Sequence, residues 1–248
     1  MAVAGTLPLT GERTVPGLAH ENYWFRRHEA AYLAVLPWID GAVVVEAGCG
    51  EGYGAARLAG RAALVVSLEA DPAVVGHVRR RYGAQVHPVR CDLQRLPIGD
   101  ARVEAVTCMQ VIEHLHDQAG FVAECARALR PGGTLVMSTP NRLTFSPGRA
   151  EPLNPFHTRE LDAGELAALL APRFEVRRLL GVHHRWRLRA LDRSTPGGLI
   201  GGQLAAAPER WPRRLAAAVA RVRAGDFAVR ADRVDESLDL LAIAVRRP

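Results

Sequence analysis

Residues 43–54, with the sequence VVVEAGCGEGYG, combine types that could bind a nucleotide-like ligand. Three consecutive valines are typical of a buried parallel strand. The glycines at alternate positions can form a tight turn that leaves the backbone open to a ligand. Residues 55–59, AARLA, then favour a helix whose free N–H groups face the same place. A strand, a glycine loop and a helix start together predict a nucleotide-type site.

The spacing of the glycines indicates which ligand binds there. A dinucleotide pattern, G-x-G-x-x-G, needs glycine where this chain has Tyr53 or Ala55. The carboxylate of Glu46, at the end of the strand, would repel a pyrophosphate and attract a cation. S-adenosylmethionine carries an ammonium and a sulfonium but no phosphate. The E-x-G-x-G-x-G pattern resembles that of class I S-adenosylmethionine-dependent methyltransferases, which implies cofactor contacts from Glu46, Gly48, Gly50 and Gly52.

Two acids compete for the ribose of that cofactor. Glu69 ends the strand predicted over 64–69, at the carboxyl edge where ligands bind. Its carboxylate can accept hydrogen bonds from both ribose hydroxyls, and it matches the ribose-binding acid of the family, with Ala70 beside the adenine. Asp71 precedes Pro72 and is typical of a helix N-cap instead. The sequence therefore favours Glu69.

Two later strand ends are expected to complete the cofactor site. Asp92 and Leu93 follow the strand predicted over 85–90. The Asp92 carboxylate can accept from the adenine amine, and the Leu93 N–H can donate to a ring nitrogen. The alternative is an ordinary turn aspartate. Gln110 ends the strand predicted over 103–109, in a segment that resembles the family's, and is expected beside the methionine portion.

Residues 23–28, YWFRRH, lie in a helix predicted over 21–36. They resemble the aromatic-arginine entry helix of related methyltransferases. The resemblance implies that Arg27 pairs with the cofactor carboxylate and that Tyr23 covers the cofactor. The alternative is an amphipathic packing helix whose arginines are exposed.

Methyl transfer to a hydroxyl requires alignment of the acceptor and removal of its proton. Histidine titrates near neutral pH, and His114 and His157 lie in segments expected to face the methyl group and the acceptor. A metal-assisted route, known from ubiquinone-type enzymes with a Glu-x-x-Glu-His motif, would use positions 110, 113 and 114. Because the first acid is Gln110 here and an amide is a poor replacement, no metal is expected.

Strands and helices alternate along the chain, which predicts an α/β fold of the Rossmann-like class I methyltransferase type. The sheet is expected to be mostly parallel, with an antiparallel last strand over 237–245, helices on both faces and a C-terminal cap insertion. The predicted parts are an N-terminal arm and entry helix (1–40), a cofactor-binding domain (41–181 and 237–248) and a substrate-side cap (182–236).

Composition restricts the partners. All 32 basic residues are arginine, and residues 173–233 hold 14 of them against 5 acids, a net charge of +9. Aromatic residues are not interleaved with the arginines, so no nucleic-acid partner is expected. The four scattered cysteines fit a reducing compartment. With no leader-like start and no long apolar run, a cytoplasmic location is expected.

The acceptor is the least defined part. Residues 10–17, TGERTVPG, resemble the arm of methyltransferases that act in glycan and oligosaccharide assembly, including the mycofactocin oligosaccharide methyltransferases. This resemblance implies an O-methylated sugar hydroxyl, and Trp186 and Trp211 of the cap would offer aromatic faces to it. A small natural product or quinone, methylated on oxygen or nitrogen, is the alternative acceptor. A non-catalytic cofactor-binding subunit is the second alternative.

Overall fold

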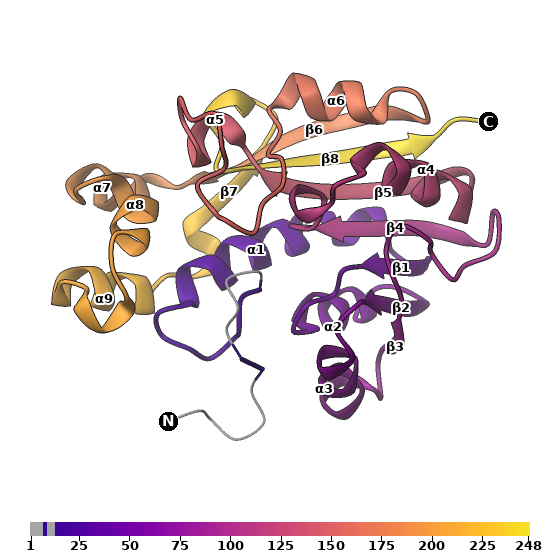
Figure 1. Ribbon diagram of the computed structural model, residues 1–248, viewed down its shortest axis with the longest axis horizontal. Coiled ribbons are helices and arrows are strands. Elements are labelled where there is room, and N and C mark those ends of the chain that lie inside the picture. Colours follow the sequence, from indigo (N-terminus) through magenta and orange to yellow (C-terminus); the bar gives the residue numbers. More distant parts are fainter. Residues whose placement is uncertain (1–6, 9–12) are drawn as a thin grey trace.

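One mixed sheet runs through the molecule (Figure 1). The computed structural model describes residues 7–8 and 13–248. The sheet order across the described residues is β3-β2-β1-β4-β5-β8-β6-β7. The strands are β1 (Val43–Ala47), β2 (Leu64–Glu69), β3 (His87–Arg90), β4 (Val103–Met109), β5 (Leu129–Pro140), β6 (Phe174–His184), β7 (Phe227–Arg230) and β8 (Asp239–Arg246).

The strand directions confirm the predicted fold class. Strands β1 to β5 pair in parallel, whereas β8 runs antiparallel to both of its neighbours, β5 and β6. The predicted antiparallel last strand is therefore present. Strand β7 was not predicted, and it pairs antiparallel with the end of β6. Parallel pairing brings the carboxyl ends of β1, β2 and β4 to one edge, where the glycine loop and Gln110 lie.

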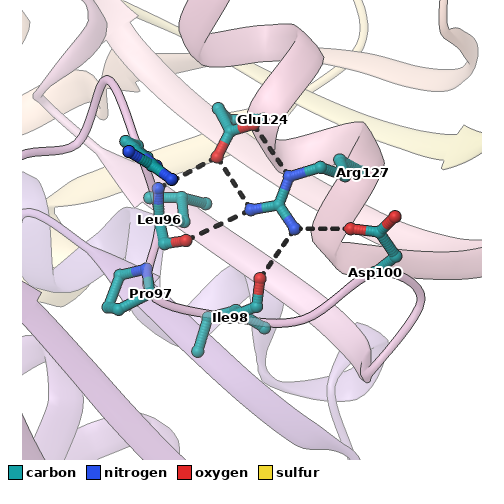
Figure 2. Close-up of a pocket in the computed structure, with 7 residues that line it drawn as sticks. Leu96, Pro97, Ile98, Asp100, Glu124 and Arg127 are labelled. Atoms are coloured by element: carbon teal, nitrogen blue, oxygen red, sulfur yellow. Dashed lines mark hydrogen bonds and ion pairs between the residues drawn. The ribbon is translucent and has the colours of Figure 1, made fainter.

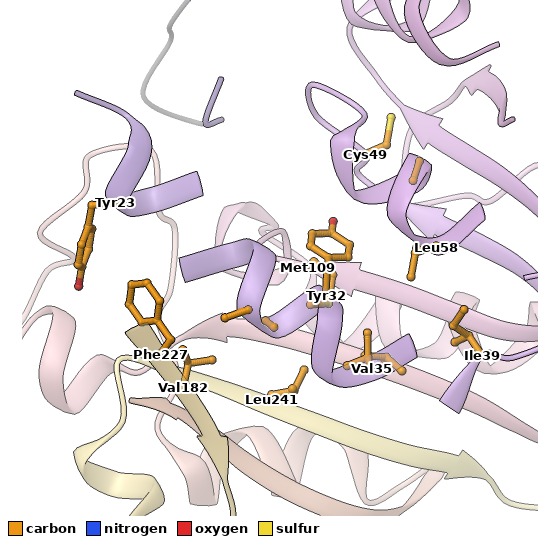
Figure 3. Close-up of a cluster of buried hydrophobic side chains, with 14 of the residues drawn as sticks. Tyr23, Tyr32, Val35, Ile39, Cys49, Leu58, Met109, Val182, Phe227 and Leu241 are labelled. Carbon is orange, nitrogen blue, oxygen red and sulfur yellow. The ribbon is translucent and has the colours of Figure 1, made fainter. Parts of the chain in front are cut away.

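Helices cover both faces of the sheet. They are α1 (Asn22–Val35), α2 (Tyr53–Ala59), α3 (Pro72–Tyr82), α4 (Gln118–Ala128), α5 (Arg142–Phe145), α6 (Ala163–Leu170), α7 (Trp186–Ser194), α8 (Gly198–Leu204) and α9 (Arg213–Ala220). Successive residues of β1 serve opposite faces: Val44 packs in a cluster with α1 and α2 (Figure 3), and Val45 packs in a cluster with α4 and α6. The valine run is apolar because both faces are buried.

The segment expected to form the cap, 182–236, contributes to the sheet at both of its ends. Strand β6 continues to His184, and residues 227–230 form β7. Between them lie α7, α8 and α9, which gather beside β7 at one end of the molecule (Figure 1). Gly201 and Gly202 lie inside α8. The helical part of the segment is therefore shorter than 182–236.

The N-terminal arm is described only in part. Residues 1–6 and 9–12, which include the first three residues of the sugar-type motif at 10–17, lie outside the described residues. Across residues 7–8 and 13–248, no helix combines the length and the apolar character needed to cross a membrane. The described part of the arm, from Arg13, approaches the glycine loop, because a Cβ on Gly50 would lie 3.8 Å from the Cβ of Arg13.

A buried ion pair fixes α1 to the sheet. The Nε of Arg27 donates to Asp239 Oδ2 at 2.6 Å, its Nη2 contacts Asp239 Oδ1, and Nη2 also donates to the carbonyl of Leu238 at 2.7 Å. Both side chains are 1% exposed. Asp239 begins β8, so the pair joins the entry helix to the last strand. Removing one partner would leave an uncompensated buried charge.

We therefore expect Asp239→Asn to lower the free energy of unfolding by about 3 kcal/mol or more, because Arg27 loses its counter-charge. Urea denaturation followed by circular dichroism measures this change. Arg61→Ala is the control, since Arg61 and Asp40 form an exposed pair at 3.6 Å, for which a loss below about 1 kcal/mol is expected. Equal losses in the two variants would contradict the importance given to the buried pair.

Candidate active site

The glycine loop between β1 and α2 has the backbone that its sequence predicts. Gly48, Gly50 and Gly52 all have positive φ, at 76°, 51° and 95°. A Cβ on Gly48 would also come within 2.5 Å of the Val111 side chain. Gly50, in contrast, faces no neighbour closer than the arm residue Arg13. The loop is therefore tightly packed behind Gly48 and open in front of Gly50, where a ligand can approach the backbone.

Glu46 lies at the base of this loop with its side chain fully buried. One carboxylate oxygen, Oε1, accepts a hydrogen bond from the Tyr32 hydroxyl at 2.6 Å. The other, Oε2, is buried without a partner. Burial raises the pKa of Glu46 to about 8. An unpartnered buried carboxylate oxygen is costly unless a donor reaches it, so Glu46 fits a cationic ligand such as the ammonium of S-adenosylmethionine.

Glu69 reaches across from β2 to the same loop. Its carboxylate accepts from the backbone N–H groups of Gly50 at 3.1 Å and Ala70 at 2.9 Å. The competing acid, Asp71, caps α3 by accepting from Ala73 N at 2.8 Å. The N-cap prediction for Asp71 is therefore confirmed. Glu69 is left as the acid that faces the ligand side of Gly50, where the resemblance placed the ribose.

Asp92 and Gln110 lie at two further strand ends. The Asp92 side chain accepts from Gln94 N at 2.9 Å in a turn, and the side chain of the following Leu93 is buried. Gln110 has a φ of 59°, an unusual value for a residue with a side chain. Its amide donates to Ser138 Oγ at 2.9 Å. Strain of this kind is concentrated at functional sites, and Gln110 borders the cavity described next.

A cavity of about 780 Å³ opens beside Gln110. Four segments that are far apart in the sequence form its walls: the arm with α1, the end of β4, the loop after β5, and the cap. Residues that line it include Arg13, Trp24, Arg27, His28, Gln110, Glu113, His114, Phe145, Asn154, Phe156, His157, Leu204 and Glu209. The Tyr53 hydroxyl ties the arm and α1 to the glycine loop through Thr14 Oγ1 at 3.2 Å and His28 Nδ1 at 3.1 Å.

Tyr23 and Arg27 do not lie as the resemblance implied. Tyr23 is fully buried, and its hydroxyl lies 2.7 Å from His184 Nε2. Figure 3 places it at the opposite end of the core cluster from Cys49 of the glycine loop, so it does not cover a ligand there. Arg27 borders the cavity, but Asp239 already neutralises it. The reason is the same for both: Tyr23 and Arg27 lie on the same face of α1, and this face packs against β7 and β8.

Arg13 is a candidate that the sequence reasoning missed. It lies over Gly50 and borders the cavity, with a side chain that is 12% exposed. Its Nη2 contacts Asp71 Oδ2 at 3.2 Å, whereas its Nη1 is buried without a partner. The arm motif at 10–17 contains this arginine. The motif was interpreted only as an indication of the acceptor.

His114 and His157 meet in the cavity wall, with ring centroids 4.9 Å apart. The Nδ1 of His157 lies 2.7 Å from Glu160 Oε1, and its Nε2 lies 3.1 Å from the Asn154 amide nitrogen. The Nδ1 of His114 lies 2.9 Å from the carbonyl of Phe156. Since a carbonyl only accepts, this nitrogen carries the proton and the neutral ring keeps its lone pair on Nε2.

Glu113 joins the two histidines in a group whose possible ligand atoms lie within 4.8 Å of one another. His157 is therefore the third member of this group, which the sequence spacing did not indicate. Burial raises the pKa of Glu113 to about 8, and Thr139 Oγ1 donates to its Oε2 at 3.0 Å. A carboxyl that holds its proton near neutral pH is a poor ligand for a divalent ion.

A second cavity, of about 450 Å³, lies away from these residues beside Arg127 of α4. Figure 2 shows the Arg127 guanidinium enclosed by its partners. It donates to both oxygens of Glu124, to Asp100, and to the carbonyls of Leu96 and Ile98, at 2.7 to 3.1 Å. These five bonds use every guanidinium donor. Arg127 therefore anchors the loop after β3 to α4 and has no donor left for a ligand.

The comparisons with known proteins agree with this geometry. A family model described as a methyltransferase domain matches residues 45–137. The chain is 54% identical, over 99% of its length and 97% of the relative's, to a probable S-adenosylmethionine-dependent methyltransferase of Mycolicibacterium smegmatis. A protein of the same description from Mycobacterium tuberculosis is 51% identical over 99% of this chain and 92% of its own.

A solved structure supports the fold. It is the complex between the Haloferax volcanii Trm112 methyltransferase activator and a putative methyltransferase, and it superposes with a TM-score of 0.62 at 19% identity, over 90% of this chain and 91% of the other. The glycine loop, the acids at the ends of β1 and β2, and the full-length relatives lead to one conclusion. The chain belongs to the class I S-adenosylmethionine-dependent methyltransferases and uses S-adenosylmethionine as its cofactor.

Proposed function

We propose that this methyltransferase transfers the methyl group of S-adenosylmethionine to a hydroxyl of a sugar, in an oligosaccharide or a glycoside. The observation that carries the proposal is the composition of the 780 Å³ cavity beside Gln110. It combines aromatic surfaces with several hydrogen-bonding side chains and a histidine pair. Sugars need this combination, because their C–H faces stack on aromatic rings while their hydroxyls require donors and acceptors.

The aromatic surfaces come from residues other than those first considered. Trp24, Phe145 and Phe156 border the cavity, and Phe156 is an exposed side chain of the loop after β5. Trp186 and Trp211 of the cap do not border it, and Trp186 is 79% exposed. The cap reaches the cavity through Leu204, Pro208 and Glu209 instead. A sugar-binding role of the cap therefore depends on these three positions.

For the cofactor, we propose that Glu46 receives the ammonium, Glu69 the ribose hydroxyls, and Asp92 with Leu93 the adenine edge beside Ala70. Gly48, Gly50 and Gly52 shape the loop, and Gln110 directs the methyl end toward the cavity. Arg13 is proposed for the cofactor carboxylate in place of Arg27, because it lies over the loop and Arg27 is already paired with the buried Asp239. The Nη1 of each arginine is buried without a partner. When bound, S-adenosylmethionine supplies the methyl group and a sulfonium leaving group.

Glu46 gives this assignment a pH signature. Its raised pKa, about 8, means that the free protein holds a proton that an ammonium ligand must displace. We expect binding of S-adenosylhomocysteine, which keeps the ammonium, to tighten by up to about tenfold per unit as the pH rises from about 6 to 7.5, since the ligand's amino group stays charged there. Isothermal titration calorimetry should also record proton release.

Glu46→Gln should bind S-adenosylhomocysteine more weakly, and its affinity should no longer rise with pH. Glu51→Gln is the matched control, because this acid of the same loop is already bonded to His77 at 2.8 Å and Tyr82 at 3.0 Å; it should keep the slope. A pH-independent affinity in the unmodified protein, or a slope that survives in Glu46→Gln, would remove Glu46 from the ammonium site.

For the chemical step, we propose that His157 takes the proton from the acceptor hydroxyl. Glu160 is almost fully buried and accepts from His157 Nδ1–H, so it would stabilise the imidazolium that forms. The acceptor hydroxyl would take the place of the Asn154 amide beside His157 Nε2. The neighbouring ring of His114 is the second candidate base, since its lone pair is also on Nε2. Proton removal in this scheme needs no metal ion.

We expect His157→Ala to lower turnover about 100-fold and Glu160→Gln to lower it less, because the first change removes the base and the second only weakens its orientation. His114→Ala tests the second candidate in the same assay. His116→Ala, which alters an exposed neighbour outside the cavity, should leave turnover unchanged. Unchanged turnover in both His157→Ala and His114→Ala would exclude these two histidines as the base.

The acceptor class itself is tested with labelled S-adenosylmethionine and a panel of oligosaccharides, glycosides, phenols and quinols, each with and without a chelator. The proposal predicts label on saccharides, unaffected by the chelator. Label on phenols or quinols alone would favour the small-molecule alternative. Cofactor binding without transfer to any panel member would favour a non-catalytic subunit, and loss of transfer in chelator would point to the Glu113–His114–His157 group as a metal site.

A further inference from the structure

A third cavity, of about 330 Å³, lies between the ends of β6 and β7 and the cap helices α7 and α8. It shares no lining residue with the acceptor cavity. The two are close neighbours nevertheless, because Thr144 borders this one and the adjacent Phe145 borders the acceptor cavity. Leu238 also lines it, and the carbonyl of Leu238 accepts from Arg27 on the acceptor side.

The lining of this cavity is basic. Arg189, Arg193, Arg230 and Arg233 face it, against the two acids Asp192 and Glu236. Arg230 pairs with Asp232 at 3.2 Å, Arg233 pairs with Glu236, and Asp192 accepts from Leu199 N at 2.7 Å. Arg189 donates to the carbonyl of His184, and within residues 7–8 and 13–248 Arg193 forms no ion pair. The lining side chains, four cations and two anions, carry a charge of +2, which Asp232 beside Arg230 reduces to +1.

Buried polar atoms next to these arginines lack partners. His183 lines the cavity with 5% exposure, and its Nε2 has no hydrogen-bond partner. The Nε of Arg230 and the Oγ of Ser237 are also buried and unpartnered. Orphaned buried donors are costly and are normally satisfied. Their number at one place indicates a ligand with several acceptor atoms.

Gly181 preserves the space between two of these groups. A Cβ at this position would lie 2.8 Å from His183 Nε2 and 2.4 Å from the Ser237 side chain. Any residue other than glycine would therefore displace them. Burial and the charge of Arg230 lower the pKa of His183, so its ring is neutral and can donate from Nε2.

From this arrangement we infer a second ligand site, separate from the cofactor and the acceptor, that binds the phosphoryl group of a small phosphorylated molecule. A phosphate monoester is close to a dianion at neutral pH and offers three acceptor oxygens, which suit the net positive charge of the arginines and the unpartnered donors. Arginine guanidinium groups bind such oxygens in pairs. A cavity of this size accommodates a phosphoryl group with several further atoms.

The test is calorimetric titration of the whole protein with inorganic phosphate, glucose 6-phosphate and glucose, at constant ionic strength set with chloride. We expect both phosphates to bind and glucose not to bind. Tighter binding of glucose 6-phosphate than of phosphate would identify a phosphorylated organic ligand, and the reverse order would identify free phosphate. Binding should persist with S-adenosylhomocysteine at saturation.

Arg193→Ala should weaken phosphate binding about tenfold or more, because a charge-assisted contact is lost. Arg193 is exposed, so we expect the variant to fold normally. The melting temperature of the variant checks this expectation. Arg214→Ala, an exposed arginine of α9 outside the cavity, should bind as the unmodified protein does. No phosphate binding, equal affinity in Arg193→Ala, or displacement by S-adenosylhomocysteine would overturn the inference, whether or not the proposed acceptor is right.

Discussion

The buried ion pair between Arg27 and Asp239 holds together the parts on which the site depends. It connects α1, which carries one wall of the acceptor cavity, to the first residue of β8, the strand at the centre of the C-terminal half of the sheet. Two fully buried charges are stable only when each satisfies the other. Because Asp239 neutralises Arg27 within the protein, we assign Arg27 a structural role and propose that a residue of the arm recognises the cofactor carboxylate.

The sheet and the arm contribute different things to the site. Parallel strands bring Glu46, Glu69 and Gln110 to one edge, and a rigid glycine loop keeps the backbone accessible there. The arm and α1 close this edge from outside, through Tyr53 and its contacts to Thr14 and His28. Glu46, at the base of the loop, has an unpartnered oxygen, and Arg13, beside Gly50, has an unpartnered nitrogen. They present opposite charges to a ligand that itself carries an ammonium and a carboxylate.

The cofactor half of the site was predictable from the sequence because local patterns determine it. The Glu46 to Gly54 spacing, the acid at the end of β2 and the N-cap at Asp71 each depend on a few neighbouring residues. Strand β7 was missed, since four residues without a strong pattern become a strand only by pairing with β6. The packing of Tyr23 and Arg27 was not predictable for a related reason: which face of α1 is buried depends on β7 and β8, distant in the sequence.

The approach of His157 to Glu113 and His114 is likewise a tertiary contact that the order of residues does not reveal. The same holds for the basic cavity, whose arginines come from α7, β7 and the turn after it. Local sequence therefore identifies the cofactor, whereas the acceptor side is formed by contacts between distant segments.

The most direct test of the account is a crystal structure of the protein with S-adenosylhomocysteine. The account predicts the ribose on Glu69, the ammonium on Glu46, the carboxylate on Arg13, and the sulfur beside Gln110, facing His157 across the acceptor cavity. A ligand whose carboxylate lies on Arg27, or whose sulfur points away from the cavity that contains His114 and His157, would contradict it.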